Sequence, residues 1–266
     1  MPGGSLLRQP GWVHRLAAFD ARAELPRLGG MARPDGVVIA SARYWAFASL
    51  DGRLVEGEMP EPPALLQRAP LVRGLVRLGL SLSPLLRRGG VARRRERWPL
   101  FFALLAPFAF VFLPGSVTTI ASLVLAVALL AWLLRGRTLR LHGAEHRAIG
   151  AAESRSLAPT WEGSARPSRF SPRCGTNFAA LVLPVAFGLD AVWPLGPALY
   201  TPLVVTGLSL ALTMELWRVV QARLGPLKVF LLPGLALQRL TTREPALADT
   251  RVALRAVASV LARERA

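Results

Sequence analysis

The sequence predicts a mainly α-helical, polytopic membrane protein with four transmembrane helices arranged as two hairpins. Three observations support this fold class. The 266-residue chain is 52% hydrophobic, it contains several uncharged runs close to the length that crosses a bilayer, and its arginines gather in alternate connections between these runs. A small N-terminal cytoplasmic β-sheet and a C-terminal amphipathic helix complete the expected fold.

The charge of the chain is strongly basic. It has 33 basic residues against 16 acidic ones, and all the basic residues except Lys228 are arginine. In a membrane protein, this excess is explained first by the positive-inside rule and by anionic headgroups. The expected partners are therefore the lipid bilayer and a protein on the cytoplasmic face, while nucleic acid is not expected except indirectly through a ribosome.

The first 30 residues contain several arginines but no apolar run, so no cleavable signal peptide is predicted. Residues Gly11 to Leu28 are weakly amphipathic and end at Gly29 and Gly30. This stretch is expected to be peripheral.

The chain then takes on β character. The runs 37–39 and 44–47 are rich in β-branched and aromatic residues, and Asp51-Gly52 before Leu54 is a hairpin turn signal. A sheet of two or three strands is expected. From Leu65 to Arg88, apolar residues alternate with arginines, which suits either a helix in the headgroup plane or an amphipathic helix packed on the sheet.

Four apolar runs follow. Pro99 to Leu113 and Ser116 to Leu134 are separated by a Pro-Gly break, which predicts one helical hairpin. Asn177 to Trp193 and Leu195 to Trp217 predict a second one. The run from Val229 to Leu237 is too short to cross, so it is interfacial, re-entrant or packed on the bundle.

The arginines orient these runs. They occur before the first run, between the second and the third, and after the fourth, whereas the two short turns have none. By the positive-inside rule both termini and the central loop face the cytoplasm, so the protein is placed in the bacterial inner membrane. The expected segments are a cytoplasmic N-terminal region, a transmembrane hairpin, a cytoplasmic loop, a second hairpin and a cytoplasmic C-terminal region: 1–98, 99–134, 135–176, 177–217 and 218–266.

The closing segment is expected to be an amphipathic helix. Leu247, Leu254, Val257 and Leu261 lie on one stripe of such a helix. The threonines before Pro245 are candidates for its N-terminal cap.

The central loop carries the chemistry of the chain. His142, Glu145 and His146 form the pattern H-x-x-E-H, which on a helix places both imidazoles on one face, close enough to share a metal ion. Glu145 is then the candidate catalytic general base. The metal is expected to be zinc or another divalent ion.

A third metal ligand is needed. Cys174 begins the third run and Glu215 lies near the end of the fourth, so the predicted topology places both at the depth of the two histidines. Either could complete the site. The alternative is that these polar residues hydrogen-bond to one another and anchor helix ends at the membrane interface, with Thr176 or Asn177 as a cap.

Three blocks of sequence resemble the YqhQ-type membrane proteins, a bacterial family of unknown function that is sometimes described as predicted metal-dependent enzymes. The blocks are 141–146, 172–178 and 233–245, and residues 70–74 match a further one. The resemblance covers nearly the whole chain and implies a metal site in the central loop. It also implies structural or binding roles for a set of further residues: Arg73, Arg173, Gly175, Thr176, Asn177, Gln238, Thr241, Thr242 and Glu244.

The chain departs from the family pattern in two places. The N-terminal glycine-rich block is short and lacks a glutamate, and Ser171 stands where many members have histidine. Both differences remove possible ligands.

Two function classes follow from these patterns. The first is a membrane-embedded, metal-dependent hydrolase that faces the cytoplasm. The second is a non-catalytic membrane scaffold or assembly factor, whose arginine-rich cytoplasmic face docks a partner complex or anionic lipid. A catalytic zinc keeps one coordination position open, whereas a structural zinc is closed by four protein ligands.

Overall fold

The computed structural model of the chain describes residues 11–87, 90–92, 96–99, 101–102, 106, 110, 113, 115–194, 200–222 and 224–265. The chain divides into two compact units, and each combines segments that are distant in sequence. Unit 1 takes residues 1–61, 133–174 and 238–266, and unit 2 takes residues 62–132 and 175–237.

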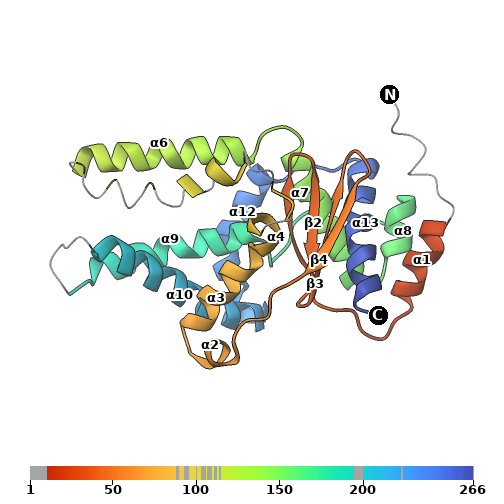
Figure 1. Cartoon of the computed structure of the whole chain (residues 1–266), viewed down its shortest axis with the longest axis horizontal. Helices are drawn as coiled ribbons and strands as arrows, with labels where there is room; N and C mark the ends of the chain where they lie inside the picture. Colours follow the sequence, from red (N-terminus) through yellow and green to blue (C-terminus); the bar gives the residue numbers. More distant parts are fainter. Residues whose placement is uncertain are drawn as a thin grey trace. The chain divides into compact units, whose positions relative to one another are not determined.

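Unit 1 contains a four-stranded antiparallel sheet, in which each strand pairs with the next one along the chain (Figure 1). The strands are β1 (Gly29–Arg33), β2 (Gly36–Ala40), β3 (Tyr44–Ser49) and β4 (Leu54–Glu58). The expected two or three strands are thus four. The sequence missed β1 because Gly29 and Gly30 are poor strand formers and its five residues show no apolar alternation.

Four helices complete the described part of unit 1. They are α1 (Gly11–Asp20), α7 (Thr138–Glu153), α8 (Leu157–Glu162) and α13 (Leu247–Arg263). Both α7 and α13 pack on the sheet, and α13 also packs along α7. Helices α8 and α1 lie side by side, and α13 contacts both of them (Figure 1).

The core of unit 1 lies between the sheet and these helices. Val37 and Ile39 of β2 point into it and are fully buried. Small residues on α7 and α13, such as Ala148 and Ala256, are fully buried too and allow the helix backbones to approach closely. Three of the four residues in the predicted apolar stripe of the C-terminal helix, Leu254, Val257 and Leu261, are 0% exposed, whereas Leu247 in the first turn is 38% exposed.

The N-terminal stretch is not peripheral, which corrects the expectation for Gly11 to Leu28. Leu16 and Phe19 of α1 are buried in the core. The carboxylate of Asp20 accepts the backbone N–H groups of Leu157 and Ala158 at the start of α8, both across 2.9 Å. A helix of ten residues has too few turns for its weak amphipathic pattern to reveal this burial.

The secondary structure described in unit 2 is entirely helical. Its elements are α2 (Ala64–Arg68), α3 (Val72–Ser81), α4 (Ser83–Leu86), α6 (Gly115–Leu133), α9 (Gly175–Ala191), α10 (Thr201–Ala222), α11 (Leu224–Leu227), the 3-10 helix η2 (Lys228–Leu231) and the start of α12 (Leu232–Thr241). Helix α10 packs on α9 and on α3. Gly74 of α3 fits directly over Met214, because a Cβ there would lie 2.5 Å from the Cβ of Met214.

The expectation of four transmembrane helices is wrong. Within the described residues, one helical stretch, Leu203–Gln221 of α10, is long and apolar enough to cross a membrane. Helices α6 and α9 are apolar over shorter stretches, Ile120–Trp132 and Gly175–Ala191. The 17 residues of α9 rise about 26 Å, less than the roughly 30 Å of a hydrocarbon core.

Two of the predicted runs fall partly outside the described residues. Most of the run from Pro99 to Leu113 does, and so do the first residues of the run from Leu195 to Trp217. The short apolar stretch from Val229 to Leu237 divides between η2 and α12.

Candidate metal site

Helix α7 brings the two histidines of the H-x-x-E-H pattern together. His142 and His146 are four residues apart, and the centroids of their rings are 4.5 Å apart. His146 is 3% exposed, and His142 is partly buried. The pattern therefore forms one imidazole pair on the face of a helix inside unit 1.

Cys174 completes the group. Its Sγ atom lies 3.2 Å from Nε2 of His142, and the side chain is 8% exposed. One ligand atom from each of the three residues lies within 4.8 Å of the others. The structure thus brings together three of the four residues that the sequence offered as metal ligands.

Backbone carbonyls fix the tautomer of both rings. Nδ1 of His142 lies 2.8 Å from the carbonyl oxygen of Thr241, and Nδ1 of His146 lies 2.7 Å from that of Arg169. A carbonyl oxygen can only accept, so each Nδ1 carries the hydrogen and donates it. The lone pair of each neutral ring is then on Nε2, as in metal-ligating histidines whose other ring N–H donates to a carbonyl.

Burial keeps both rings neutral. It lowers the pKa of His142, and burial together with the neighbouring His142 lowers the pKa of His146 to about 4. Nε2 of His146 is buried and has no hydrogen-bond partner among the described residues. A neutral imidazole with an unused buried lone pair is the form that binds a metal ion.

The segment 238–244 forms a wall beside the two histidines. Gly143 allows this approach, since a Cβ at this position would lie only 2.3 Å from the carbonyl oxygen of Arg243. The N–H of Arg243 donates to the carbonyl of Leu139 across 2.8 Å. The glycine between the histidines therefore lets the carbonyl of Thr241 reach His142.

Gln238 fixes the loop that leads to Cys174. It is fully buried, its Oε1 accepts the N–H of Ser171 across 2.9 Å, and its Nε2 donates to the carbonyl of Ser171 across 2.7 Å. The Oγ1 atom of Thr242, also fully buried, donates to the carbonyl of Gln238. Gln238, which the resemblance singled out, thus holds the backbone three residues before Cys174, and Thr242 holds the backbone of Gln238.

Two arginines connect the same loop to α7 and to the segment 238–244. Arg147 donates to the carbonyl of Pro167 across 3.0 Å and pairs with Glu244 at 2.7 Å. Arg169 donates to the carbonyl of Thr242 across 2.9 Å. Glu244 is therefore paired with Arg147 and is not a member of the ligand group.

Glu145, the predicted general base, points elsewhere. Its carboxyl group lies against β1, where a Cβ on Gly30 would be 3.0 Å from Oε1, and the backbone of Ala32 forms a hydrogen bond with it. Burial raises the pKa of Glu145 to about 8, although the bond from Ala32 opposes this rise. The side chain is 5% exposed and is not a member of the ligand group.

Glu215 belongs to unit 2 and is held by Arg73, the residue of the additional family block. Nε and Nη2 of Arg73 lie 2.8 and 2.6 Å from the two carboxylate oxygens, and the N–H of Leu71 donates to Oε1 across 3.3 Å. The structure does not add Glu215 to the ligand group.

The residues around Cys174 divide between the two units. Arg173 pairs with Glu153 at 2.5 Å in unit 1. Helix α9 begins at Gly175, so Thr176 and Asn177 lie in its first turn. Asn177 is fully buried and touches Gly234 so closely that a Cβ there would be 2.3 Å from its Oδ1.

The donor set fits a transition metal ion. Two imidazole nitrogens and one sulfur suit zinc better than magnesium or calcium. The three ligand atoms lie within 4.8 Å of one another. This distance is slightly greater than the sum of two metal–ligand bonds, each about 2.0 to 2.3 Å long. The group could therefore hold a metal ion after small side-chain adjustments.

The sequence reasoning missed the carbonyls of Arg169 and Thr241 and the role of Gly143. Every residue has a backbone carbonyl, so the sequence cannot indicate which carbonyls accept the histidine hydrogens. The role of Gly143 could have been predicted, because a glycine inside a helix often marks a close approach of another backbone.

The comparisons with known proteins give one match. The model of a family described as "Protein of unknown function (DUF1385)" matches residues 101–263, which include all three members of the ligand group. No curated protein and no solved structure matches the chain. That the protein is of the YqhQ type, and that it lies in a membrane, stay predictions. Since the match covers more than half of the sequence, the chain belongs to the DUF1385 family of proteins of unknown function.

Proposed function

We propose that the protein binds one zinc ion, or another divalent metal ion, through His142, His146 and Cys174, and that it is a metal-dependent hydrolase associated with a membrane. The observation that carries this proposal is the convergence of the three ligand atoms within 4.8 Å. Both Nδ1 atoms are held by carbonyls, which leaves the lone pair of each neutral ring on Nε2.

The number of ligands supports a catalytic site rather than a structural one. Among the residues that the structure describes, the group has three members. Catalytic zinc sites typically have three protein ligands and one open position, whereas structural sites have four. A zinc ion held in this way supplies Lewis acidity, which polarises a carbonyl or phosphoryl oxygen of a substrate.

Glu145 receives a different role from the one expected for an H-x-x-E-H hydrolase. Its carboxyl group faces Gly30 and Ala32 of β1, so we assign it to holding β1 on α7. In this proposal, the two histidines and the cysteine bind the metal ion, and Gln238 and Arg169 position them.

Membrane association is supported by unit 2. The stretch Leu203–Gln221 has a mean hydropathy of 1.6 over its apolar window, and the one carboxylate in it, Glu215, is paired with Arg73. Large apolar side chains are exposed on three helices of this unit: Ile120, Leu123, Val124, Val127, Leu130, Leu183, Phe187, Leu203, Val204, Leu212 and Val219. We propose that lipid covers these side chains, because a soluble surface rarely exposes so many together.

The arginines support a cytoplasmic position for unit 1. Eight of them lie between Arg135 and Arg173, next to the apolar helices in the chain. We propose that the metal site opens toward the cytoplasm, at the level of the headgroups.

Metal analysis of the purified full-length protein tests the site. We expect about one equivalent of zinc in the wild type and almost none in a His142→Ala/His146→Ala variant. His14→Ala is the matched control, because His14 is exposed on α1 and lies outside the ligand group. Equal metal content in all three proteins would sink the proposal.

A second measurement separates the enzyme from the scaffold. In cobalt-substituted protein, added cyanide should shift the visible spectrum if a coordination position is open. An unchanged spectrum would indicate a closed structural site and favour the scaffold. Extraction of isolated membranes with alkaline carbonate tests the lipid association, and we expect the protein to stay in the pellet.

A further inference from the structure

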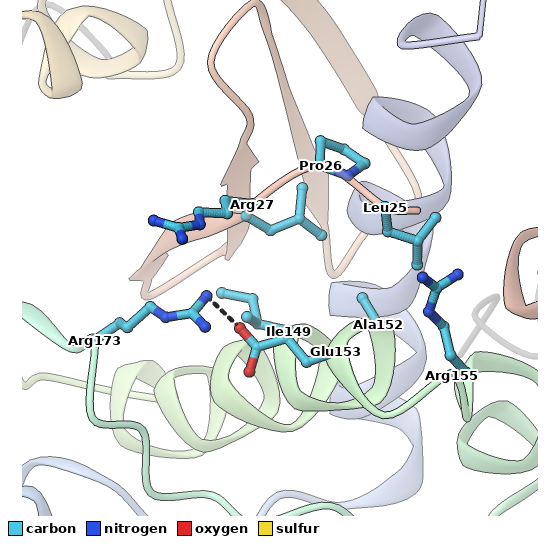
Figure 2. Close-up of a pocket in the computed structure, with 9 residues that line it drawn as sticks. Leu25, Pro26, Arg27, Ile149, Ala152, Glu153, Arg155 and Arg173 are labelled. Atoms are coloured by element: carbon cyan, nitrogen blue, oxygen red, sulfur yellow. Dashed lines mark hydrogen bonds and ion pairs between the residues drawn. The ribbon is translucent and has the colours of Figure 1, made fainter. Parts of the chain in front are cut away.

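A second feature of unit 1 is a polar pocket of about 280 Å³ near the C-terminal end of α7. Its walls come from the segment before β1, from α7 and from the residue preceding Cys174 (Figure 2). Leu25, Pro26 and Leu28 form the apolar part. Ile149 and Ala152 of α7 add to it, and four charged side chains form the rest.

The pocket lies along the same stripe of α7 as the histidines. Residues 142, 146, 149 and 153 follow the i, i+4, i+7, i+11 spacing that places them on one face of a helix. Ile149 and Glu153 line the pocket, and Ile149 is about 4.5 Å beyond His146 along the helix axis. Arg173 lines it as well and is followed by the ligand Cys174.

Three arginines and one carboxylate give the pocket a net positive charge: Arg27, Arg155, Arg173 and Glu153. Arg155 is held by the carbonyl oxygens of Arg22 and Ala23, which bring no negative charge. Its backbone has a positive φ of 55°, which is uncommon for a residue other than glycine. The structure therefore fixes one arginine at the pocket without neutralising it.

The other two arginines lie on the opposite side of the pocket (Figure 2). Nη1 of Arg173 donates a hydrogen bond to Oε1 of Glu153 across 2.5 Å. Arg27 is exposed and, among the described residues, makes no hydrogen bond or ion pair. An anion that entered the pocket would meet an unpaired guanidinium at Arg27 and would compete with Glu153 for Arg173.

We propose that this pocket binds the phosphate group of a ligand, and that it is the recognition subsite for the substrate of the metal site. The second half of the proposal rests on the proposed function. Guanidinium groups match phosphate oxygens through paired hydrogen bonds. The volume is at the lower end for small-molecule pockets, which suits one phosphate group and a short apolar extension against Leu25 and Pro26.

The experiment measures the binding of inorganic phosphate and of glycerol phosphate to the full-length protein by calorimetry at low ionic strength. Arg27→Gln should weaken binding about tenfold, because it removes a charge-assisted hydrogen bond to the phosphate. Glu153→Gln should tighten binding, because it removes the carboxylate that competes for Arg173. Arg265→Gln is the matched control, since Arg265 is exposed in unit 1 and does not line the pocket.

A second arm separates a soluble phosphate from a lipid headgroup. The protein is tested on phosphatidylcholine vesicles with and without phosphatidic acid. If phosphatidic acid is bound and the two soluble phosphates are not, and Arg27→Gln weakens that binding, the proposal holds with a lipid as the source. If neither probe binds, or if neither Arg27→Gln nor Glu153→Gln changes the affinity, the proposal is overturned.

Metal content of the same samples distinguishes this proposal from the proposed function. His146→Ala should lose metal and keep phosphate binding, whereas Arg27→Gln should lose phosphate affinity and keep its metal. Failure of the first result counts against the metal site, and failure of the second against the pocket.

Discussion

Gln238 holds the backbone of Ser171 through two hydrogen bonds, one accepted by Oε1 across 2.9 Å and one donated by Nε2 across 2.7 Å. Ser171 is three residues before Cys174, and a completely buried glutamine therefore fixes the loop that carries the sulfur. The neighbouring carbonyl of Arg169, which fixes His146, belongs to the same loop. One side chain thus positions both the cysteine and an anchor of a histidine.

Replacing Gln238 should weaken metal binding without removing a ligand. In Gln238→Ala, we expect the metal Kd to rise about 10- to 100-fold, as is usual when a residue that orients a metal ligand is lost. Competition with a chelator measures this change. Gln67→Ala is the control, because Gln67 is an exposed glutamine in unit 2. An unchanged Kd in Gln238→Ala would show that the loop holds its position without the glutamine.

Gly143→Ala should disturb the site by overpacking. The new Cβ would lie 2.3 Å from the carbonyl oxygen of Arg243, which is backbone and cannot rotate away. We expect a loss of about 1 to 3 kcal/mol in the free energy of unfolding, together with weaker metal binding. Gly79→Ala is the control, because a Cβ there meets nothing within 4 Å. Equal thermal stability of the two variants would argue against the close contact.

Cys174→Ser tests whether the sulfur is a ligand. With cobalt in place of zinc, the wild type should show the near-ultraviolet charge-transfer band of a cobalt–thiolate bond, and the variant should lack it. The histidines should still hold some cobalt, with lower affinity, because two of the three ligands remain. A band that persisted in Cys174→Ser would exclude this cysteine as the ligand.

Much of the candidate site could be predicted from the sequence because its spacing is local. The pair His142 and His146 follows from the four-residue period of a helix alone. Cys174 was predicted as a ligand because its segment was expected to start at the same membrane depth as the two histidines. That assumption used a four-span topology which the structure contradicts, yet the cysteine still lies 3.2 Å from His142.

The parts that could not be predicted depend on contacts between distant residues. Glu145 was expected at the metal because H-x-x-E-H hydrolases place it there, but β1 covers that face of α7. Strand β1 itself gave no β signal. The transmembrane count failed because uncharged runs were counted as helices, whereas α9 ends at Ala191 and is too short.

Glu215→Gln should leave the metal content unchanged. Both carboxylate oxygens of Glu215 are engaged by Arg73, so the residue is not available as a ligand. Instead we expect unit 2 to lose about 1 to 2 kcal/mol of stability, since the pair is only about one-fifth exposed and lies in an apolar helix. Thermal unfolding and metal analysis of the same sample check both outcomes. A loss of metal with normal stability would restore Glu215 as a ligand.

The pH dependence of stability should carry the signature of Glu145. Burial raises the pKa of its carboxyl group from the ordinary 4.5 to about 8. Between these two pH values the folded protein keeps the proton, while the unfolded chain releases it. The contribution of Glu145 to stability is therefore complete below pH 4.5 and is lost as the pH rises toward 8, by up to about 1.4 kcal/mol per pH unit.

Glu145→Gln isolates this effect, because glutamine imitates the protonated carboxyl group and does not titrate. His146 shifts in the opposite sense, since its lowered pKa removes stability as the pH falls from 6.5 toward 4, but this contribution cancels in the difference between the two proteins. With a chelator present, the unfolding free energy of the variant should increase relative to that of the wild type as the pH rises from 4.5 to 8. Two parallel curves over this range would mean that Glu145 is solvated in the folded protein and does not hold β1 on α7.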